Sequence, residues 1–261
     1  MLFLLTLLAM QPGSKAQLSD SFVGPGSIYD TSKPKTSWQI STSERRFNAR
    51  SYILPGMMIA YGITAIGNEG LKDVNAHLNH EIYGERPHHT VGIDNYLQYA
   101  PAVLAFGLDI AGIKAKHDFK DRTMLVLMSN VITSVTVSSI KKHSHQLRPD
   151  GSSYTSFPSA HTAFAFTNAE FLRREYKDIS PWYGVLGYSM AIGTGYLRMY
   201  NNKHWLSDVI AGAGVGILST KLAYWLYPEI KRSLFKNKLP NTVVMPTYQD
   251  GAIGLGLVNK F

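Results

Sequence analysis

The chain has 261 residues, and its 26 lysines and arginines exceed its 18 aspartates and glutamates, which gives a formal net charge of +8. Charged residues make up 17% and hydrophobic residues 45%, a more apolar balance than that of an ordinary soluble domain. The 15 tyrosines, 11 phenylalanines and 4 tryptophans supply material for a core and exclude intrinsic disorder. Because there is no cysteine, a disulfide scaffold and a cysteine-based zinc or redox site are also excluded.

The positive charge does not indicate a nucleic-acid partner. Proteins that bind nucleic acid concentrate lysine and arginine on one face, often with aromatic residues between them. Here the basic residues fall in short clusters between uncharged stretches, a pattern typical of the loops of membrane proteins. We therefore predict a membrane partner and no nucleic acid.

The N-terminal segment 1–17 resembles a secretory signal. It has an apolar run from Leu2 to Met10 and the small residues Ser14 and Ala16, although a basic start is absent. The run is too short to span a bilayer. Residues 18–50 follow as a predicted exposed leader, since most of this segment is polar and rich in serine, threonine, glycine and proline.

The next part of the chain, residues 51–232, alternates uncharged stretches with charged connectors. Six stretches are long enough for helices and lack the strict alternation of strands. They are Ser51–Asn68, Asn95–Leu108, Thr123–Ile140, Pro158–Ala169, Ile179–Leu197 and Val209–Tyr227, the last broken only by Lys221. The sequence therefore predicts an all-α domain, a six-helix bundle.

The C-terminal tail, residues 233–261, has a different pattern. Two apolar runs, Thr242–Tyr248 and Ala252–Phe261, flank Asp250-Gly251. Asp-Gly between two such runs is a hairpin signal, so the tail is predicted to form a small β-hairpin.

Two locations remain open for the helical domain. If the helices span a membrane and the segment before the first is cytoplasmic, basic residues gather on the cytoplasmic side, as the positive-inside rule requires. They are Arg45, Arg46, Arg50, Lys114, Lys116, Lys120, Arg122, Arg173, Arg174, Lys177, Lys231, Arg232, Lys236 and Lys238. A cleaved signal conflicts with this, because it would invert the six spans. The alternative is a soluble exported helical bundle, since Thr123–Ile140 holds eight serine, threonine or asparagine residues.

Candidate chemistry begins where the third predicted helix ends. Lys141 and Arg148 are seven residues apart, and Pro149 excludes a helix there. A guanidinium group offers a planar fork to phosphate oxygens, and an ammonium group adds a point charge. By itself the segment is better explained as a solvated basic helix end that the helix dipole favours.

A second segment, Phe157-Pro158-Ser159-Ala160-His161, opens the fourth predicted helix. The first backbone N–H groups of a helix form an anion site, and a histidine there can donate a proton. By itself Ser159 would be an N-cap residue and His161 a bystander.

The third segment leads into the sixth predicted helix and contains Arg198, His204 and Asp208. His204 and Asp208 are four residues apart, so they share a face of a helix. The carboxylate can orient one ring nitrogen and leave the other free as a nucleophile. Gly212 and Gly216 continue the same step and predict close helix packing.

In order, the three segments read K-x6-R-P, P-S-A-H and R-x5-H-x3-D. This pattern resembles the tripartite signature of the type 2 phosphatidic acid phosphatases, a family that shares its site with vanadium-dependent haloperoxidases and bacterial non-specific acid phosphatases. The helical pattern extends the resemblance to about residues 51–227. Two positions depart from it: Ala160 replaces the usual glycine, and Leu197 replaces the usual serine.

The resemblance implies a metal-independent phosphatase that needs no cofactor. Lys141, Arg148 and Arg198 would clamp the phosphate, and Ser159 with the Ala160 N–H would complete the cradle. His204, oriented by Asp208, would attack phosphorus and form a phosphohistidine, while His161 would protonate the leaving alcohol. The implied substrate is a lipid phosphate or pyrophosphate, such as phosphatidic acid, an isoprenyl pyrophosphate or lipid A. If the helices span the cell envelope membrane, the segregation of basic residues predicts that the site faces the non-cytoplasmic, periplasmic side.

Other functions compete with this one. The same pocket would hold vanadate in a haloperoxidase, and a soluble periplasmic acid phosphatase or a non-catalytic lipid-binding protein are further alternatives. A metal site built from His77, His80, His88 and His89 is a weaker reading, and we predict none. The sequence leaves the particular lipid and the oligomeric state open.

Overall fold

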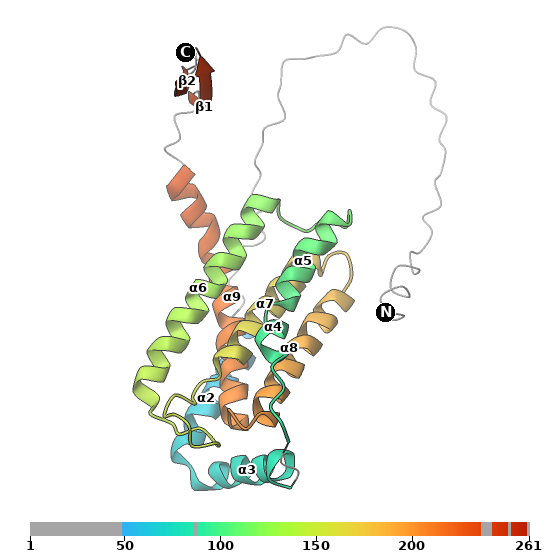
Figure 1. Cartoon of the computed structure of the whole chain (residues 1–261), viewed down its shortest axis with the longest axis vertical. Coiled ribbons are helices and arrows are strands. Elements are labelled where there is room, and N and C mark those ends of the chain that lie inside the picture. Colours follow the sequence, from blue (N-terminus) through green and yellow to red (C-terminus); the bar gives the residue numbers. More distant parts are fainter. Residues whose placement is uncertain (1–48, 86–87, 236–241, 250–251, 260–261) are drawn as a thin grey trace, which may run out of the picture. The chain divides into compact units, whose positions relative to one another are not determined.

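A computed structural model describes residues 49–85, 88–235, 242–249 and 252–259 (Figure 1). In chain order its elements are α2 (Arg50–Gly67), α3 (Glu69–Asn79), the π-helical segment η2 (His80–Gly84), α4 (Asp94–Leu97), α5 (Ala100–Ile110), α6 (Phe119–Ser144), α7 (Ala160–Tyr176), α8 (Trp182–Tyr200), α9 (Leu206–Phe235), β1 (Thr242–Gln249) and β2 (Ala252–Asn259).

The all-α prediction for the main domain is confirmed. The six predicted stretches correspond to α2, α5, α6, α7, α8 and α9. The count of six is wrong for the described residues, because α3, η2 and α4 are also helical. The pattern missed α3 because Glu69, Lys72 and Asp73 interrupt any uncharged stretch. This helix begins instead with a side-chain cap, in which Asn68 Oδ1 accepts a hydrogen bond from Leu71 N at 3.1 Å.

The two strands pair antiparallel, with a register that runs from Thr242 opposite Asn259 to Gln249 opposite Ala252. They occupy the tail for which the sequence predicts a hairpin. The predicted turn at Asp250-Gly251 lies outside the described residues, as do the signal-like segment and residues 18–48 of the predicted leader.

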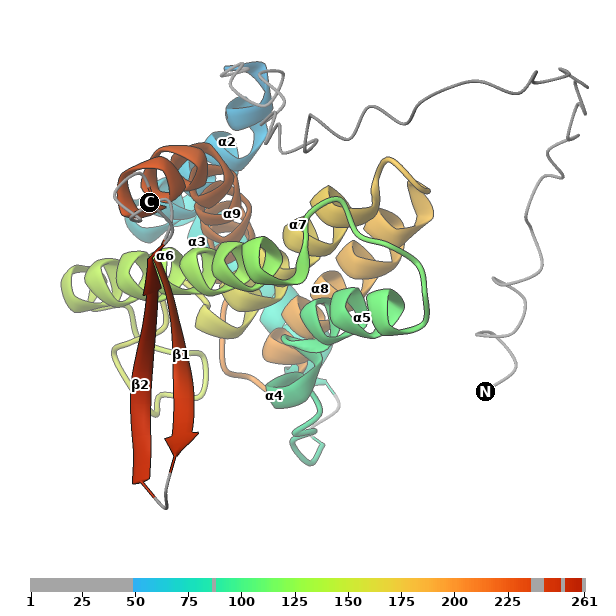
Figure 2. The same cartoon turned by 90° about the horizontal axis from the view of Figure 1, so that it is seen from above.

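Helix α7 is the centre of the bundle and packs against α5, α6, α8 and α9 (Figure 2). Glycines on α9 allow the closest approach. A Cβ at Gly212 would lie 2.6 Å from the Ser159 carbonyl oxygen, and one at Gly216 would collide with the Ala163 carbonyl oxygen. The predicted close packing through these two glycines is confirmed, and it holds the start of α7 against α9.

Two of the hydroxyl-bearing residues of α6 point inward. Ser129 and Thr133 are fully buried, and the Thr133 hydroxyl lies 2.7 Å from that of Thr167 on α7. On the opposite face of the same helix Val131 and Val135 are 60% and 61% exposed. The eight polar residues that made this stretch look unsuited to lipid therefore include some that bond within the bundle, while apolar side chains face outward.

The same arrangement recurs around the bundle. Exposed apolar side chains include Met57 on α2, Val103 on α5, Ile192 on α8 and Trp225 on α9. Two helices of the described part are long and apolar enough to cross a membrane, over Phe119–Ser144 and Leu206–Ser233. The core is accordingly more polar, and parts of the surface more apolar, than in an ordinary soluble domain.

Candidate active site

The three sequence segments meet at one end of the bundle, which we call the site end (Figure 1). It comprises the end of α6, the loop of residues 145–159, the start of α7, the end of α8 and the start of α9. The loop is tied to α9 directly, because Ser159 N donates to the Asp208 carbonyl oxygen at 3.0 Å. Segments that are up to 67 positions apart in sequence, from Lys141 to Asp208, thus share one site.

His204 and Asp208 form a buried pair. The distance from His204 Nδ1 to Asp208 Oδ2 is 3.5 Å, and the side chains are 2% and 1% exposed. The same Oδ2 accepts from Ser156 Oγ at 2.5 Å and from Trp205 N at 3.0 Å. His204 precedes α9, which begins at Leu206, so the pair spans the entrance of the helix rather than one of its faces.

Burial lowers the pKa of His204 to about 4, against the opposing attraction of Asp208. Lys141 and Arg198 lower it further through their positive charges. The imidazole is therefore neutral at pH 7. Its Nδ1, which faces Asp208 Oδ2 at 3.5 Å, is buried without a hydrogen bond. Its Nε2 makes no hydrogen bond to the described residues either, so this nitrogen is available as a nucleophile.

Two cations of the site have no carboxylate partner among the described residues. Lys141 Nζ donates to the backbone carbonyl oxygens of Thr155 and Ser156. Arg148 is held by its backbone N–H, which donates to the Ser153 carbonyl oxygen at 3.0 Å, and its Nε is buried without a hydrogen bond. Unpaired cations in such a setting are suited to bind an anion.

The third cation is paired with a residue that the sequence did not single out. Arg198 Nη1 donates to Asp94 Oδ2 at 2.5 Å, and Asp94 is 1% exposed. Asp94 is the charged residue directly before the uncharged stretch Asn95–Leu108. Asp94 was not predicted as a site residue, because a carboxylate at the start of a helix normally caps that helix.

His161 and Ser159 sit at the start of α7. His161 Nε2 lies 2.8 Å from Asn95 Oδ1, a second contact from α4 that the sequence did not predict. Ser159 is fully buried and caps the helix, since its Oγ accepts from Thr162 N at 3.4 Å. The structure thus supports the capping reading of Ser159, and its contact with phosphate stays a prediction, as does that of the Ala160 N–H.

The charged groups lie close enough to act on one another. Lys141 interacts electrostatically with Asp208, Arg148 and Arg198. His161 experiences the charges of Arg198, Asp94, Arg148 and Lys141. The eight residues predicted from sequence therefore belong to one constellation, in which three cations act on His161 and two of them, Lys141 and Arg198, also act on His204.

A clasp, formed by two contacts, joins the loop 145–159 to the segment between α8 and α9. Lys203 Nζ donates to Asp150 Oδ2 at 2.6 Å, and Trp205 Nε1 donates to the Leu147 carbonyl oxygen at 2.8 Å. Although burial opposes it, hydrogen bonds from Lys203 and Ser152 lower the pKa of Asp150 to about 2. The clasp holds Arg148 and His204 on facing segments.

The peripheral histidines take part in separate contacts. His77 Nε2 lies 3.1 Å from Glu81 Oε1, and the ring of His88 stacks on Tyr200 with centroids 3.5 Å apart. Within the described ranges no group of three histidine, aspartate or glutamate residues could hold a metal ion.

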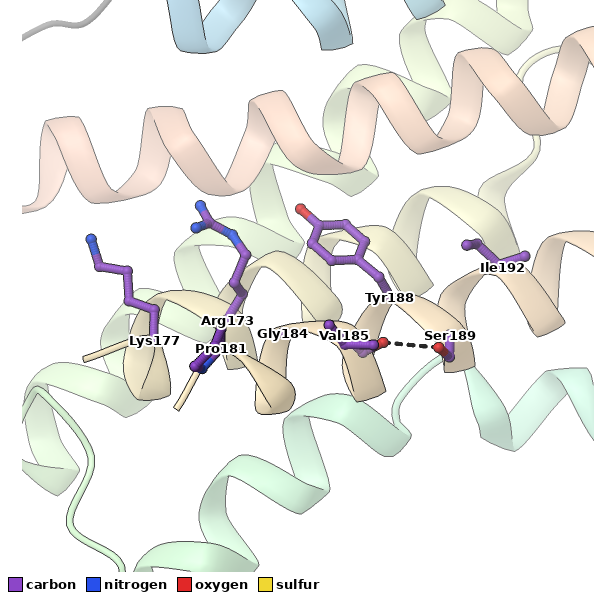
Figure 3. A pocket seen from close by; sticks show the side chains of 8 residues that line it. All are labelled: Arg173, Lys177, Pro181, Gly184, Val185, Tyr188, Ser189 and Ile192. Carbon is purple, nitrogen blue, oxygen red and sulfur yellow. Dashed lines mark hydrogen bonds between the residues drawn. The ribbon is translucent and has the colours of Figure 1, made fainter. Parts of the chain in front are cut away.

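A groove of about 430 Å³ lies away from the site end, between α7 and α8 (Figure 3). Apolar residues such as Val185 and Ile192 line it, together with Arg173, Lys177 and Tyr188. Arg173 and Tyr188 are both hydrogen-bonded to buried Glu170, so these groups are already satisfied. The groove contains none of the residues predicted to act in catalysis.

Comparison with known proteins identifies relatives of this constellation. The family model of the PAP2 superfamily matches residues 122–232. Lipid A 1-phosphatase of Porphyromonas gingivalis is 38% identical over 141 residues, which cover 54% of this chain and 32% of that protein. The chain thus aligns with about a third of the length of this curated relative.

Two solved structures are similar. LpxE of Aquifex aeolicus has 23% identity and a TM-score of 0.45, with 57% of this chain and 94% of that chain covered. A transmembrane PAP2-type phosphatidylglycerolphosphate phosphatase of Bacillus subtilis has 18% identity and a TM-score of 0.46, with 71% and 99% covered. The part of the chain that the PAP2 superfamily model matches, residues 122–232, contains all eight predicted site residues.

Proposed function

We propose that this protein is a metal-independent phosphatase that hydrolyses the phosphate or pyrophosphate ester of a membrane lipid through a phosphohistidine. One observation carries the proposal: Lys141, which has no carboxylate partner among the described residues, interacts electrostatically with both members of the buried pair of His204 and Asp208. Arg148, a second cation of this kind, interacts with Lys141. A phosphate group would be the anionic partner of these cations, and its phosphorus would then lie next to the neutral imidazole of His204.

In the first step His204 Nε2 attacks phosphorus, and the bond from phosphorus to the ester oxygen breaks. His161 gives a proton to the departing oxygen, so that the lipid leaves as an alcohol or, from a pyrophosphate, as a monophosphate. Asp208 stabilises the imidazolium character of His204 as the new phosphorus–nitrogen bond forms. The product of this step is a phosphohistidine.

In the second step water attacks the phosphohistidine and gives a proton to His161. The phosphorus–nitrogen bond breaks, inorganic phosphate forms, and His204 is again neutral. Lys141, Arg148 and Arg198 stabilise the negative charge on the equatorial oxygens throughout, a role that metal ions fill in other phosphoryl-transfer enzymes.

The surface of the bundle supports a lipid substrate. Apolar side chains on α2, α5, α6, α8 and α9 are exposed, while serine, threonine and asparagine side chains bond inside. We infer that these helices span the cell envelope membrane and that a lipid enters the site end sideways. The similarity to a lipid A 1-phosphatase makes a phosphorylated lipopolysaccharide anchor the first substrate to test.

The distribution of basic residues supports the orientation. Lysines and arginines outside the site concentrate at the ends of the helices away from Lys141, including Lys114, Arg174 and Lys231. By the positive-inside rule those ends are cytoplasmic, and the site end faces the periplasm.

Single cysteines at positions 152 and 114 test this orientation, because the chain has no cysteine of its own. A membrane-impermeant reagent should label Ser152→Cys in intact cells and spare Lys114→Cys. Labelling of both, with release of the protein by carbonate, would indicate a soluble exported phosphatase.

The decisive activity experiment tests the full chain in detergent on three lipid phosphates and on bromide. Phosphate release should occur from at least one of short-chain phosphatidic acid, an isoprenyl pyrophosphate and lipid A 1-phosphate. Its rate should be unchanged in excess EDTA, and vanadate should inhibit it. Bromide oxidation by peroxide and vanadate, without phosphate release, would identify a haloperoxidase instead. Loss of activity on chelation that magnesium or zinc restores would contradict metal independence.

A further inference from the structure

The single turn α4 contacts two of the predicted site residues at once. Asp94 forms the ion pair with Arg198, and the next residue, Asn95, contacts His161. Both partners lie far away in sequence, at separations of 104 and 66 residues. Neither Asp94 nor Asn95 belongs to the three sequence segments of the site.

The position of α4 is fixed from both sides. Before it, Val91 exchanges two backbone hydrogen bonds with the side chain of Asn201 at the end of α8, at 2.8 and 2.9 Å. After it, the carbonyl oxygen of Gln98 accepts from Asn168 Nδ2 on α7 at 2.9 Å. Because α8 carries Arg198 and α7 carries His161, these bonds hold α4 against both residues.

The contact between Asn95 and His161 determines which ring nitrogen can exchange a proton. Asn95 Oδ1 is an acceptor and cannot take up a proton at ordinary pH, so the hydrogen between the two atoms belongs to His161 Nε2. The neutral histidine then carries its proton on Nε2 and a lone pair on Nδ1. No hydrogen bond to the described residues occupies Nδ1.

We propose that Asn95 is a positioning residue that fixes the tautomer of His161 and leaves Nδ1 as its acid–base atom. This inference rests on the proposed phosphatase function. In the cationic form Nδ1–H gives its proton to the departing ester oxygen. In the second step the Nδ1 lone pair accepts the proton of the attacking water. The Nε2–H bond to Asn95 is kept through both steps, so no further proton acceptor is needed.

The neutral amide suits the charges around His161. Burial disfavours the imidazolium form most, Arg198, Arg148 and Lys141 disfavour it further, and Asp94 favours it. Asn95 orients the imidazole ring of His161 without adding a charge that favours or disfavours its imidazolium form. An aspartate at this position would keep the acceptor and add a negative charge, which separates the orienting role from the electrostatic one.

The test compares wild type, Asn95→Ala, Asn95→Asp and His161→Ala on an alkyl phosphate and a nitrophenyl phosphate. Asn95→Ala should lower kcat on the alkyl phosphate by about 10- to 100-fold, with a much smaller loss on the nitrophenyl ester, whose leaving group needs no proton. KM should change little. The double variant Asn95→Ala/His161→Ala should be no slower than His161→Ala, because both substitutions remove the same function, proton transfer by His161.

Asn95→Asp should keep the wild-type ratio between the two substrates and move the alkaline limb of the pH profile to higher pH. Tyr96→Phe is the matched control, since Tyr96 lies on the same turn and is 78% exposed. Equal losses on both substrates in Asn95→Ala, or additive losses in the double variant, would overturn the inference while wild type remains active. An inactive wild type would instead count against the proposed function.

Discussion

Charge is handled differently at the two ends of the helical bundle. At the opposite end, where α6 begins and α7 finishes, half-buried and buried cations are paired with carboxylates. Arg173 and Arg174 both bond to Glu170, which is 1% exposed, and buried Arg122 bonds to Asp109 at 2.9 Å. At the site end Lys141 and Arg148 have no such partner in the described part of the chain.

The difference separates structural charge from functional charge. Pairing offsets the cost of removing a cation from water, so the opposite end is stabilised by its own contacts. An unpaired cation is costly unless an external anion provides the missing contact. Arg198 is intermediate, because Asp94 neutralises it. Under the proposed function, the site end is therefore the part of the bundle in which unpaired cations lower stability and bind the phosphate group.

The nucleophile provides the largest expected effect. His204→Ala should lower kcat by at least about 10⁴-fold, since no other described imidazole lies against Asp208. The fold should persist, because Asp208 keeps its bonds to Ser156 and Trp205. His143→Ala, an exposed histidine at the same end, is the control and should leave kcat unchanged. Turnover by His204→Ala near the wild-type rate would exclude a phosphohistidine at this position.

Matched arginine substitutions test the comparison between the ends. Arg148→Gln should lower kcat/KM by about 10²- to 10³-fold, with thermal stability equal to or above that of wild type, because an unpaired cation is removed. Arg173→Gln should keep its activity and lose roughly 1–3 kcal/mol of stability, because buried Glu170 loses two hydrogen bonds. Phosphate release and thermal unfolding in detergent measure both. The comparison fails if Arg148→Gln is the less stable variant and Arg173→Gln the less active one.

The acid side of the pH profile provides a third measure. Because burial lowers the pKa of His204 to about 4, the acid limb of kcat/KM should lie well below pH 6.5, after correction for the ionisation of the substrate. Between pH 6.5 and 4 the unfolded chain binds a proton that the folded chain does not, so stability from neutral His204 is present above pH 6.5 and lost as the pH falls. An acid limb at 6.5, with flat stability over that interval, would contradict a buried neutral imidazole.

The clasp should give the smallest effect. Lys203→Gln removes the ion pair between Lys203 and Asp150, whose side chains are 33% and 19% exposed, respectively. Because the pair is partly exposed, the loss in kcat/KM should be no more than about five-fold. Because salt screens exposed pairs, the difference from wild type should shrink as the salt concentration rises. Lys142→Gln, at an exposed lysine without an ion pair in the described structure, serves as the control. A loss comparable to that of Arg148→Gln would place Lys203 among the phosphate-binding cations.

Much of this protein was determined by local patterns. The six uncharged stretches predicted helices because a helix follows from spacing and composition over a dozen neighbouring residues. The four-residue step from His204 to Asp208 predicted their proximity, although His204 precedes α9 and the two do not share a helix face. Ser159 was recognised as a possible cap. The charged segment of α3 escaped prediction because its capping asparagine is a weak signal beside the interruptions in hydrophobicity.

The tertiary structure alone decided which cations are free and which are neutralised. Arg173 and Arg148 look alike in sequence, yet one bonds to buried Glu170 and the other has an unsatisfied Nε. Asp94 and Asn95 join the site across 104 and 66 residues of chain. Contacts of that kind leave no periodic trace, because they depend on how whole helices pack around α7 and not on the spacing of residues within any one of them.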